Sequence, residues 1–170
     1  MIKKISRYLR KEDRIIDIGA GTGNICELLT REQFQITPLD VKNLSFVKSV
    51  KPVIYNGNEI PFPDNDFDVS LLLTVLHHTP FPEKLVAEAV RVSRRIIIIE
   101  DIYTNKLHKY ITYFIDSLLN FEFIGHPHTN KSDREWKALF TRLGLKLKKV
   151  EYIRSFLVFK QAIYYLEKNS

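Results

Sequence analysis

The fold of this chain follows from the stretch Arg14-Ile-Ile-Asp-Ile-Gly-Ala-Gly-Thr-Gly23. Its first part, Arg14 to Ile18, is a short β-branched run that is typical of a buried strand. Apolar residues then return at helical spacing, at Ile25, Leu28 and Leu29. Glycines let a backbone turn sharply and approach a ligand without interference from Cβ atoms. The stretch therefore predicts a strand, a tight turn and a helix, with a ligand at the turn.

Strands and helices alternate along most of the remaining chain. Further strands are predicted at Gln35 to Leu39, Pro52 to Tyr55, Phe67 to Leu73 and Arg95 to Ile99. Helices are predicted around Leu44 to Lys48, from Pro82 onward, over Lys106 to Asn120, and after the capping-box pair Ser132 and Glu135, with Gly144 as the terminating residue. This alternation favours parallel strands joined by helices.

The last two strand-like runs, Leu145 to Tyr152 and Ser155 to Tyr165, are close enough in sequence to pair antiparallel. We therefore expect an α/β fold with a doubly wound, mostly parallel seven-stranded sheet and an antiparallel C-terminal strand pair. A length of 170 residues suits one domain spanning residues 1–170. Ligands of such sheets bind at the carboxyl ends of the strands, where the glycine turn lies.

Composition excludes several kinds of protein. No apolar run approaches the roughly 20 residues that cross a bilayer, so no membrane insertion is expected. The start, Met1 to Arg7, has no secretory signal pattern, and we expect a cytoplasmic location. Cys26 is the only cysteine, which excludes an internal disulfide and a cysteine-based metal site.

The chain is basic, with a formal net charge of +6 at pH 7. Six cations crowd the N-terminus: Lys3, Lys4, Arg7, Arg10, Lys11 and Arg14. A solvated helix face is the favoured interpretation, because no aromatic residues alternate with these charges as they do in many nucleic-acid sites. Nucleic-acid binding stays open as the alternative.

The spacing of the glycines distinguishes between cofactors. Gly19, Gly21 and Gly23 give Gly-x-Gly-x-Gly, and Asn24 stands where a dinucleotide fingerprint has its third glycine. A pyrophosphate binder is therefore disfavoured. Asp40 closes the second predicted strand, where a carboxylate accepts hydrogen bonds from both hydroxyls of a ribose. These residues together point to a nucleoside-bearing cofactor.

Four stretches in this order resemble the class I S-adenosylmethionine-dependent methyltransferases, in particular the broad family of small methyltransferase domains. They are Ile15 to Gly23, Leu39-Asp-Val41, Asn56 to Asp68 and Val75-Leu-His-His78, and the resemblance covers roughly Ile2 to Gly144. It implies a Rossmann-like fold and the cofactor S-adenosyl-L-methionine, with S-adenosyl-L-homocysteine as product.

The resemblance also implies a set of cofactor-binding residues. Asp17 and the backbone of Gly19, Ala20 and Gly21 would hold the amino-acid end, with Asp40 on the ribose and Val41 against the adenine. Asn56 stands where the family usually has a carboxylate; its side-chain oxygen still accepts from the adenine amino group, while Gly57 offers its backbone N–H. Gly23 and Thr74 complete the expected set.

Two residues are candidates for catalysis. By the resemblance, His77 and His78 stand near the cofactor's methyl group, with His78 as a candidate base, although shaping the loop is as good an interpretation of the pair. Asp101, beside Glu100 at the end of a strand, would orient a substrate hydroxyl or amine, or cap a helix. His126 and His128 lack a third ligand nearby, so no metal site is expected. The helix Lys106 to Asn120 would cover the acceptor pocket, with Tyr103, Tyr110, Tyr113 and Phe114 as candidate lining residues, although core packing is the favoured interpretation for most of these aromatics.

The leading hypothesis is methyl transfer from S-adenosylmethionine to a small-molecule acceptor. The alternatives are an RNA methyltransferase and a catalytically silent cofactor-binding module that acts as a partner subunit. A nicotinamide oxidoreductase is disfavoured by the displaced third glycine. Only one short helix precedes the first strand, so we expect the acceptor pocket to be open or to be completed by another chain. That chain would be a partner protein or a second copy in a homodimer.

Overall fold

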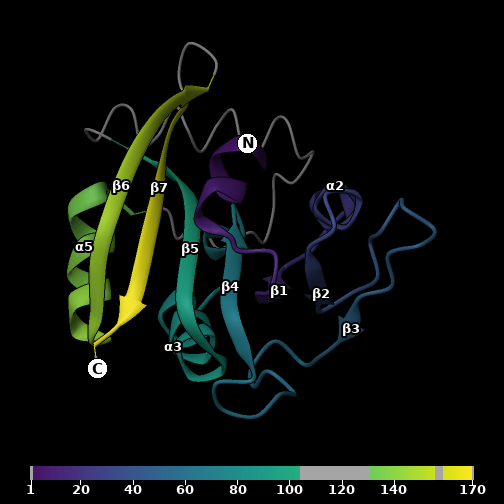
Figure 1. Cartoon of the computed structure of the whole chain (residues 1–170). Coiled ribbons are helices and arrows are strands. Elements are labelled where there is room, and N and C mark those ends of the chain that lie inside the picture. The colour runs from purple at the N-terminus through teal and green to yellow at the C-terminus, as the bar shows by residue number, and fades with distance from the viewer. Residues whose placement is uncertain (1, 104–130, 156–158, 170) are drawn as a thin grey trace, which may run out of the picture.

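The computed structural model describes residues 2–103, 131–155 and 159–169. They form a seven-stranded sheet in the order β3-β2-β1-β4-β5-β7-β6, as Figure 1 shows. The strands are β1 (Arg14–Ile18), β2 (Gln35–Asp40), β3 (Val53–Ile54), β4 (Phe67–Leu73), β5 (Ser93–Ile102), β6 (Leu145–Ser155) and β7 (Phe159–Lys168). The first five run parallel, and β7 pairs antiparallel with both β5 and β6. The expected sheet is confirmed.

Helices cover both faces of the sheet. The helices of the described residues are α1 (Ile2–Ile5), η1 (Ser6–Tyr8), α2 (Asn24–Arg31), η2 (Leu76–His78), α3 (Pro82–Val92) and α5 (Asp133–Arg142). Ile5 and Leu29, from α1 and α2, pack on one face. Trp136 of α5 and Val86 of α3 pack on the other. No helix in the described ranges is long and apolar enough to cross a membrane.

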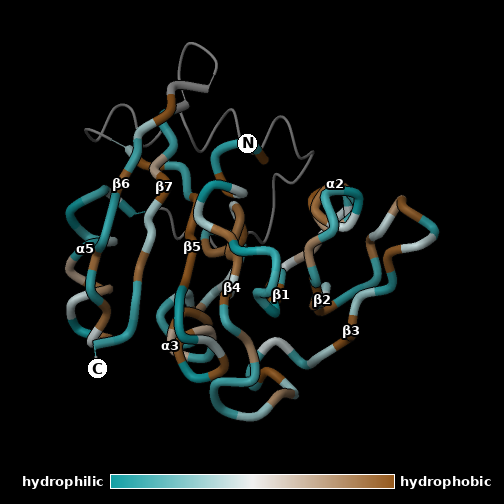
Figure 2. The backbone as a smooth tube through the Cα atoms, viewed as in Figure 1, coloured by the Kyte–Doolittle hydropathy of each residue, from teal (hydrophilic) through white to brown (hydrophobic). Residues whose placement is uncertain are grey.

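The central strand β5 carries the most apolar run of the sheet. Ile96 to Ile99 are fully buried, alternating between the two core clusters, and Figure 2 shows the hydrophobic colour along this strand. Burial on both faces is what a central strand with helices on each side requires. The strand also extends to Ile102, beyond the predicted end at Ile99.

The α5 helix begins where the capping pattern predicts. Glu135 N donates to Ser132 Oγ at 3.3 Å, and the Ser132 backbone N–H donates to Glu135 Oε2 at 2.7 Å. Hydrogen bonds from Ser132 first, and then Tyr103, lower the pKa of Glu135 to about 2. Gly144 follows the helix with a φ of +68°. This left-handed residue after the helix is the predicted stop.

The predicted helix around Leu44 to Lys48 is wrong, because these residues are irregular, with a bend at Val47 and a turn at Lys48. The Ser45 hydroxyl accepts from Val47 N at 3.1 Å, and Asn43 Oδ1 accepts from Ser45 N at 3.2 Å. Such local side-chain bonds to the backbone compete with helix formation. The third strand is also shorter than the predicted Pro52 to Tyr55 and leaves β3 as a two-residue edge. The predicted helix Lys106 to Asn120 lies outside the described residues.

Candidate functional site

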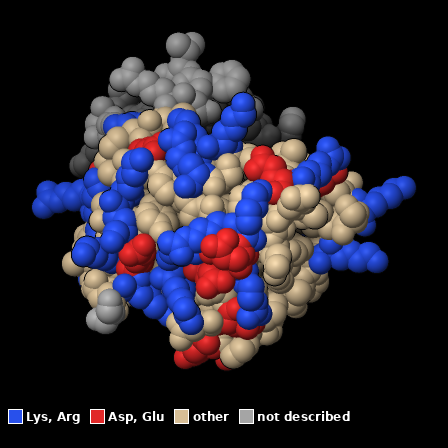
Figure 3. Space-filling view, in the orientation of Figure 1, with Lys and Arg blue, Asp and Glu red and all other residues tan. Residues whose placement is uncertain are grey.

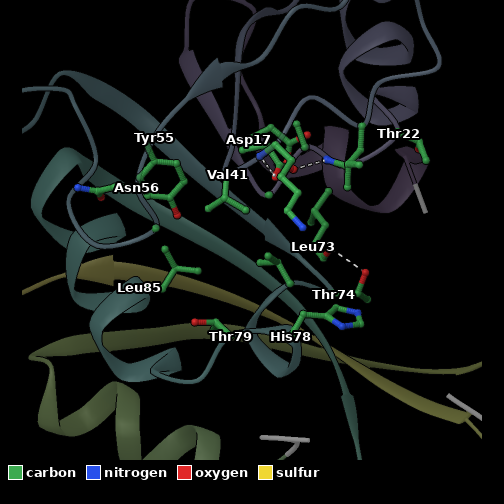
Figure 4. Close-up of a pocket in the computed structure, with 18 of the residues that line it drawn as sticks. Asp17, Thr22, Val41, Tyr55, Asn56, Leu73, Thr74, His78, Thr79 and Leu85 are labelled. Carbon is green, nitrogen blue, oxygen red and sulfur yellow. Dashed lines mark hydrogen bonds between the residues drawn. The ribbon is translucent and has the colours of Figure 1, made fainter. Parts of the chain in front are cut away.

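A pocket of about 950 Å³ opens at the carboxyl ends of β1, β2 and β4 (Figure 4). Ten residues of the expected site line it: Asp17, Gly19, Ala20, Gly21, Asp40, Val41, Asn56, Gly57, Thr74 and His78. They come from segments far apart in the sequence, and the parallel sheet brings the ends of their strands to one edge. The pocket is therefore where the fold class predicts a ligand.

The glycine turn lets the backbone pass close to neighbouring side chains. At Gly19, with a φ of +81°, an added Cβ would lie 2.4 Å from Val75 Cγ2. Gly19 N and Ala20 N both donate to Leu39 O, at 2.8 and 3.1 Å, which ties the turn to the end of β2. Only glycine adopts this conformation at this distance without strain. The turn thus lines the pocket with backbone rather than side chains.

Asp40 links the glycine turn to the segment after β2. Its Oδ2 accepts from Gly21 N at 2.8 Å and its Oδ1 from Lys42 N at 3.2 Å. The side chain is buried at 8% exposure and still lines the pocket. A carboxylate has about four lone-pair sites, so each oxygen retains capacity for a ligand hydroxyl. Its position suits the expected contact with a ribose.

Asp17 is a buried carboxyl group in the wall of the pocket. Burial, with the nearby charge of Asp40, raises its pKa to about 6, while a hydrogen bond from Cys26 acts in the opposite direction. The Cys26 thiol lies 3.1 Å from Asp17 Oδ2, and burial raises the thiol's own pKa. A thiol is a weak donor. A cationic ligand group beside Asp17 would therefore stabilise its ionised form.

The Asn56 side chain shapes the turn after β3. Its Oδ1 accepts from Asn58 N at 2.9 Å and from Glu59 N at 3.2 Å. Gly57 follows with a φ of +80°, and a Cβ there would lie 3.3 Å from Val41 Cγ1. The oxygen expected to accept from an adenine amino group thus already accepts two backbone hydrogen bonds. Its capacity for a further bond is smaller than that of a carboxylate.

The segment after β4 carries unusual backbone geometry. Thr74 has a φ of +55°, which is costly for a β-branched residue, and its N donates to Ile99 O at 2.7 Å. His78 lines the pocket at the end of η2. His77 is buried instead, and its Nδ1 lies 2.7 Å from Oε2 of the fully buried Glu100. Strain of this kind concentrates at functional sites.

Two residues of the expected site do not line the pocket. Gly23 is the N-cap of α2 with a φ of +78°, and a Cβ there would lie 2.6 Å from Ser45 Oγ. Asp101 lies within β5, opposite Gln161 of β7. Tyr103 contacts Glu135 Oε2 at 2.7 Å and is not a lining residue either. Residues Tyr110, Tyr113, Phe114, His126 and His128 lie outside the described residues.

The pocket also contains residues that sequence reasoning missed. They are Thr22, Asn24, Ile25, Lys42, Leu44, Tyr55, Asn58, Leu73, Val75, Thr79, Pro80, Phe81, Lys84 and Leu85. Figure 4 shows Tyr55 and Leu85 close to Asn56, at the end of the pocket opposite Thr22. Leu85 was predicted only as part of an apolar helix face, and its spacing does not distinguish a core residue from a lining residue.

These features fit a nucleoside cofactor that carries an amino acid. The glycine turn offers space that a Cβ would fill, and Asp17 and Asp40 are two carboxyl groups at separate points of the same pocket. Val41 and Leu85 supply apolar surface for a base. The pocket thus combines hydrogen-bond donors, hydrogen-bond acceptors and apolar walls, as ligand sites usually do.

Comparisons with known proteins agree with this geometry. A family model described as a methyltransferase domain matches residues 16–96. The ubiquinone/menaquinone biosynthesis C-methyltransferase UbiE of Psychromonas ingrahamii is 26% identical over 126 residues, which cover 64% of this chain and 49% of that protein. The 27-O-demethylrifamycin SV methyltransferase of Amycolatopsis mediterranei is 29% identical over 100 residues, covering 51% and 36%. The chain spans half or less of the length of these curated relatives.

The fold recurs in a solved complex from Haloferax volcanii, between the Trm112 methyltransferase activator and a methyltransferase. The similar chain has a TM-score of 0.75 and 13% sequence identity, with 99% of this chain and 89% of that chain covered. At this identity the likeness supports the fold alone. It extends over nearly the whole chain, including the antiparallel strands beyond residue 96.

Proposed function

The chain belongs to the class I S-adenosylmethionine-dependent methyltransferases, enzymes whose cofactor is S-adenosylmethionine, and we propose that it methylates a small organic acceptor. One observation carries the proposal: the glycine turn, Asp17 and Asp40 meet in one pocket at the carboxyl edge of the sheet. Support for a small acceptor comes from the relatives, whose names refer to quinone biosynthesis and to a rifamycin.

The cofactor roles follow from the contacts. Asp40 would accept the ribose hydroxyls while it holds Gly21 N, and Asp17 would face the ammonium group, which stabilises the carboxylate at neutral pH. Val41 would pack against the adenine, Gly57 would offer its backbone N–H to the ring, and Asn56 would be a weaker acceptor for the amino group. Thr74 would approach the amino-acid end from β4.

Methyl transfer depends more on the alignment of the acceptor with the cofactor than on acid or base groups. When bound, the cofactor supplies an electrophilic methyl group on a sulfonium sulfur. The protein's task is to hold an acceptor in line with that group and to exclude water. His78 lines the pocket and would take the proton of an acceptor oxygen or nitrogen. Asp101 lies in β5, outside the pocket lining, and is the weaker of the two candidates.

A second candidate is a methyltransferase subunit that needs a protein partner. In the Haloferax complex a methyltransferase is bound by an activator, and its fold covers nearly all of this chain. The pocket of this chain is bordered by exposed apolar side chains, with Leu44 and Phe81 at 54% and 58% exposure. A partner or second copy that covers them would complete the acceptor side.

Calorimetric titration tests the cofactor site. Wild type and Asp40→Ala would be titrated with S-adenosylmethionine, S-adenosylhomocysteine and NADH. We expect micromolar binding of the two adenosyl compounds to wild type, a loss of at least tenfold in the variant, and no binding of NADH. Lys51→Ala, an exposed residue outside the pocket lining, is the matched control and should bind like wild type.

Transfer of a radiolabelled methyl group then identifies the acceptor class. Label that appears in small-molecule extracts supports the proposal, and label that appears in purified RNA favours the RNA methyltransferase. Cofactor binding without transfer to either pool, followed by transfer after addition of a copurifying protein, favours the partner subunit. No binding of either adenosyl compound would contradict methyl transfer by this chain.

A further inference from the structure

A positively charged surface lies on the side of the sheet that carries α1 and η1. We call it the basic face, and its members are Arg7, Arg10, Lys146, Lys148 and Lys149. Figure 3 shows Lys and Arg side chains over this side, where η1 and β6 lie, with smaller groups of Asp and Glu side chains between them. The N-terminal cations alone predicted a solvated helix face. The fold adds cations from β6.

Contacts place cations from distant parts of the sequence side by side. Arg7 Nη1 and Lys149 Nζ lie 3.5 and 3.2 Å from the same oxygen of Glu151, and Lys149 Nζ lies 5.4 Å from the Tyr8 ring centroid. Thus η1 and β6 present their charges together. Arg7 and Lys149 remain about half exposed, at 52% and 53% of their side-chain surface.

The basic face has fewer carboxylates than cations. Glu151 is shared by Arg7 and Lys149, and Glu167 pairs with Lys148 at 3.3 Å. Among the described residues, no ion pair within 4 Å involves Lys146.

Surface ion pairs contribute little to stability, so the existing pairs are weak reasons for so many cations here. An excess of exposed positive charge raises the local concentration of anionic partners.

We infer that the basic face binds the phosphate backbone of RNA. The side chains that favour membrane insertion lie elsewhere: none of the exposed large hydrophobic residues of the described part belongs to this face, and they include Leu44, Phe46, Ile54 and Phe81. The described part of the face is strand surface and short helical turns, with no long helix to enter the major groove of DNA. RNA is recognised largely through backbone and shape.

The basic face is separate from the cofactor pocket. None of its five residues lines that pocket. RNA binding should therefore persist in Asp40→Ala, even where cofactor binding is lost. The inference stands whichever molecule accepts the methyl group, and its failure leaves the proposed methyl transfer untouched.

Fluorescence anisotropy with labelled 20-nucleotide single-stranded RNA tests the inference at several salt concentrations. We compare wild type with K146Q/K148Q/K149Q and with the control R31Q/K48Q/K51Q. The control removes the same charge from α2 and from the segment between β2 and β3. Thermal melting of all three proteins shows whether each variant is folded.

Wild type should bind RNA more weakly as salt rises. K146Q/K148Q/K149Q should lose about tenfold or more in affinity, and the slope of log K against log salt should become less negative by about 2. The control should stay within twofold of wild type. Equal losses of RNA affinity in both variants would show that the effect depends on net charge alone, and would overturn the inference. Absence of binding at 50 mM salt would do so too, as would tighter binding of DNA of the same sequence or of anionic lipid vesicles.

Discussion

The thiol of Cys26 donates a hydrogen bond to Asp17 Oδ2 at 3.1 Å, and the two side chains are only 1% and 2% exposed. The thiol is the single side-chain donor to this carboxyl group among the hydrogen bonds of the described residues. A weak donor does not compensate for the removal of a carboxylate from water. The ionisation of Asp17 therefore decreases the stability of the ligand-free protein.

Asp17 should give the ligand-free protein a specific pH dependence. Its pKa is about 6 in the folded chain, against an ordinary value of 3.8 for an aspartate in water. The stability it contributes is complete below about pH 4 and is lost as pH rises through about 6. The loss is roughly 3 kcal/mol. Urea unfolding from pH 4 to 8 should show this decline in wild type but not in Asp17→Asn, and parallel curves for the two proteins would contradict it.

Gly19→Ala should destabilise the protein through two separable effects. A left-handed conformation costs a non-glycine residue about 1–2 kcal/mol, and the new Cβ would also meet Val75 Cγ2 at 2.4 Å. Gly144→Ala is the matched control, since its φ is +68° but no atom lies within 4 Å of the added Cβ. Urea unfolding should give a larger loss at Gly19, and Val75→Ala should restore part of it. Equal losses at the two glycines would argue against the steric effect.

The Glu100 side chain should stabilise the segment after β4. Its two oxygens lie 2.7 Å from Leu76 N and from His77 Nδ1, and the side chain is fully buried. Loss of a buried hydrogen-bond partner costs about 1–3 kcal/mol for each bond, so Glu100→Ala, which removes both bonds, should unfold at a much lower urea concentration. Glu100→Gln keeps an acceptor for Leu76 N and should lose about 1–2 kcal/mol. A harmless Glu100→Ala would show that the pair does not hold this segment.

The contribution of the α5 capping box to stability should be measurable through substitutions at Ser132 alone. Ser132→Ala removes the acceptor of Glu135 N and should cost about 1 kcal/mol of stability. Ser132→Asp retains a side-chain acceptor and should stay close to wild type in chemical unfolding. If the aspartate variant were as unstable as the alanine variant, the cap would not be the reason for the loss.

Much of the cofactor site could be predicted from short-range signals. The glycine spacing and the position of Asp40 after a predicted strand placed both at the carboxyl edge of the sheet, and in the structure Gly21 N donates to Asp40 there. The parallel strands and the antiparallel C-terminal pair followed from the element sequence as well, but the position of β7 between β5 and β6 did not. These features depend on local pattern and on the general rules of strand connection.

The features that sequence reasoning missed depend on long-range contacts. The bond between Glu100 and His77 joins β5 to η2, and no spacing in the sequence indicates it. The strained φ of Thr74 likewise follows from its hydrogen bond to Ile99 O. The irregular backbone at Ser45 arises from side-chain competition with the helix, which the apolar pattern does not report.

The placement of β7 between β5 and β6 has a consequence for folding during synthesis. The parallel strands β1, β4 and β5 lie within the first 102 residues, whereas the partner of Ile99 is Ile163, in a strand that is synthesised later. Until β7 arrives, the most apolar strand of the molecule has an open edge, which is prone to pairing with other chains. Long-range pairings of this kind slow folding, so a chaperone that shields β5 should raise the yield of native protein.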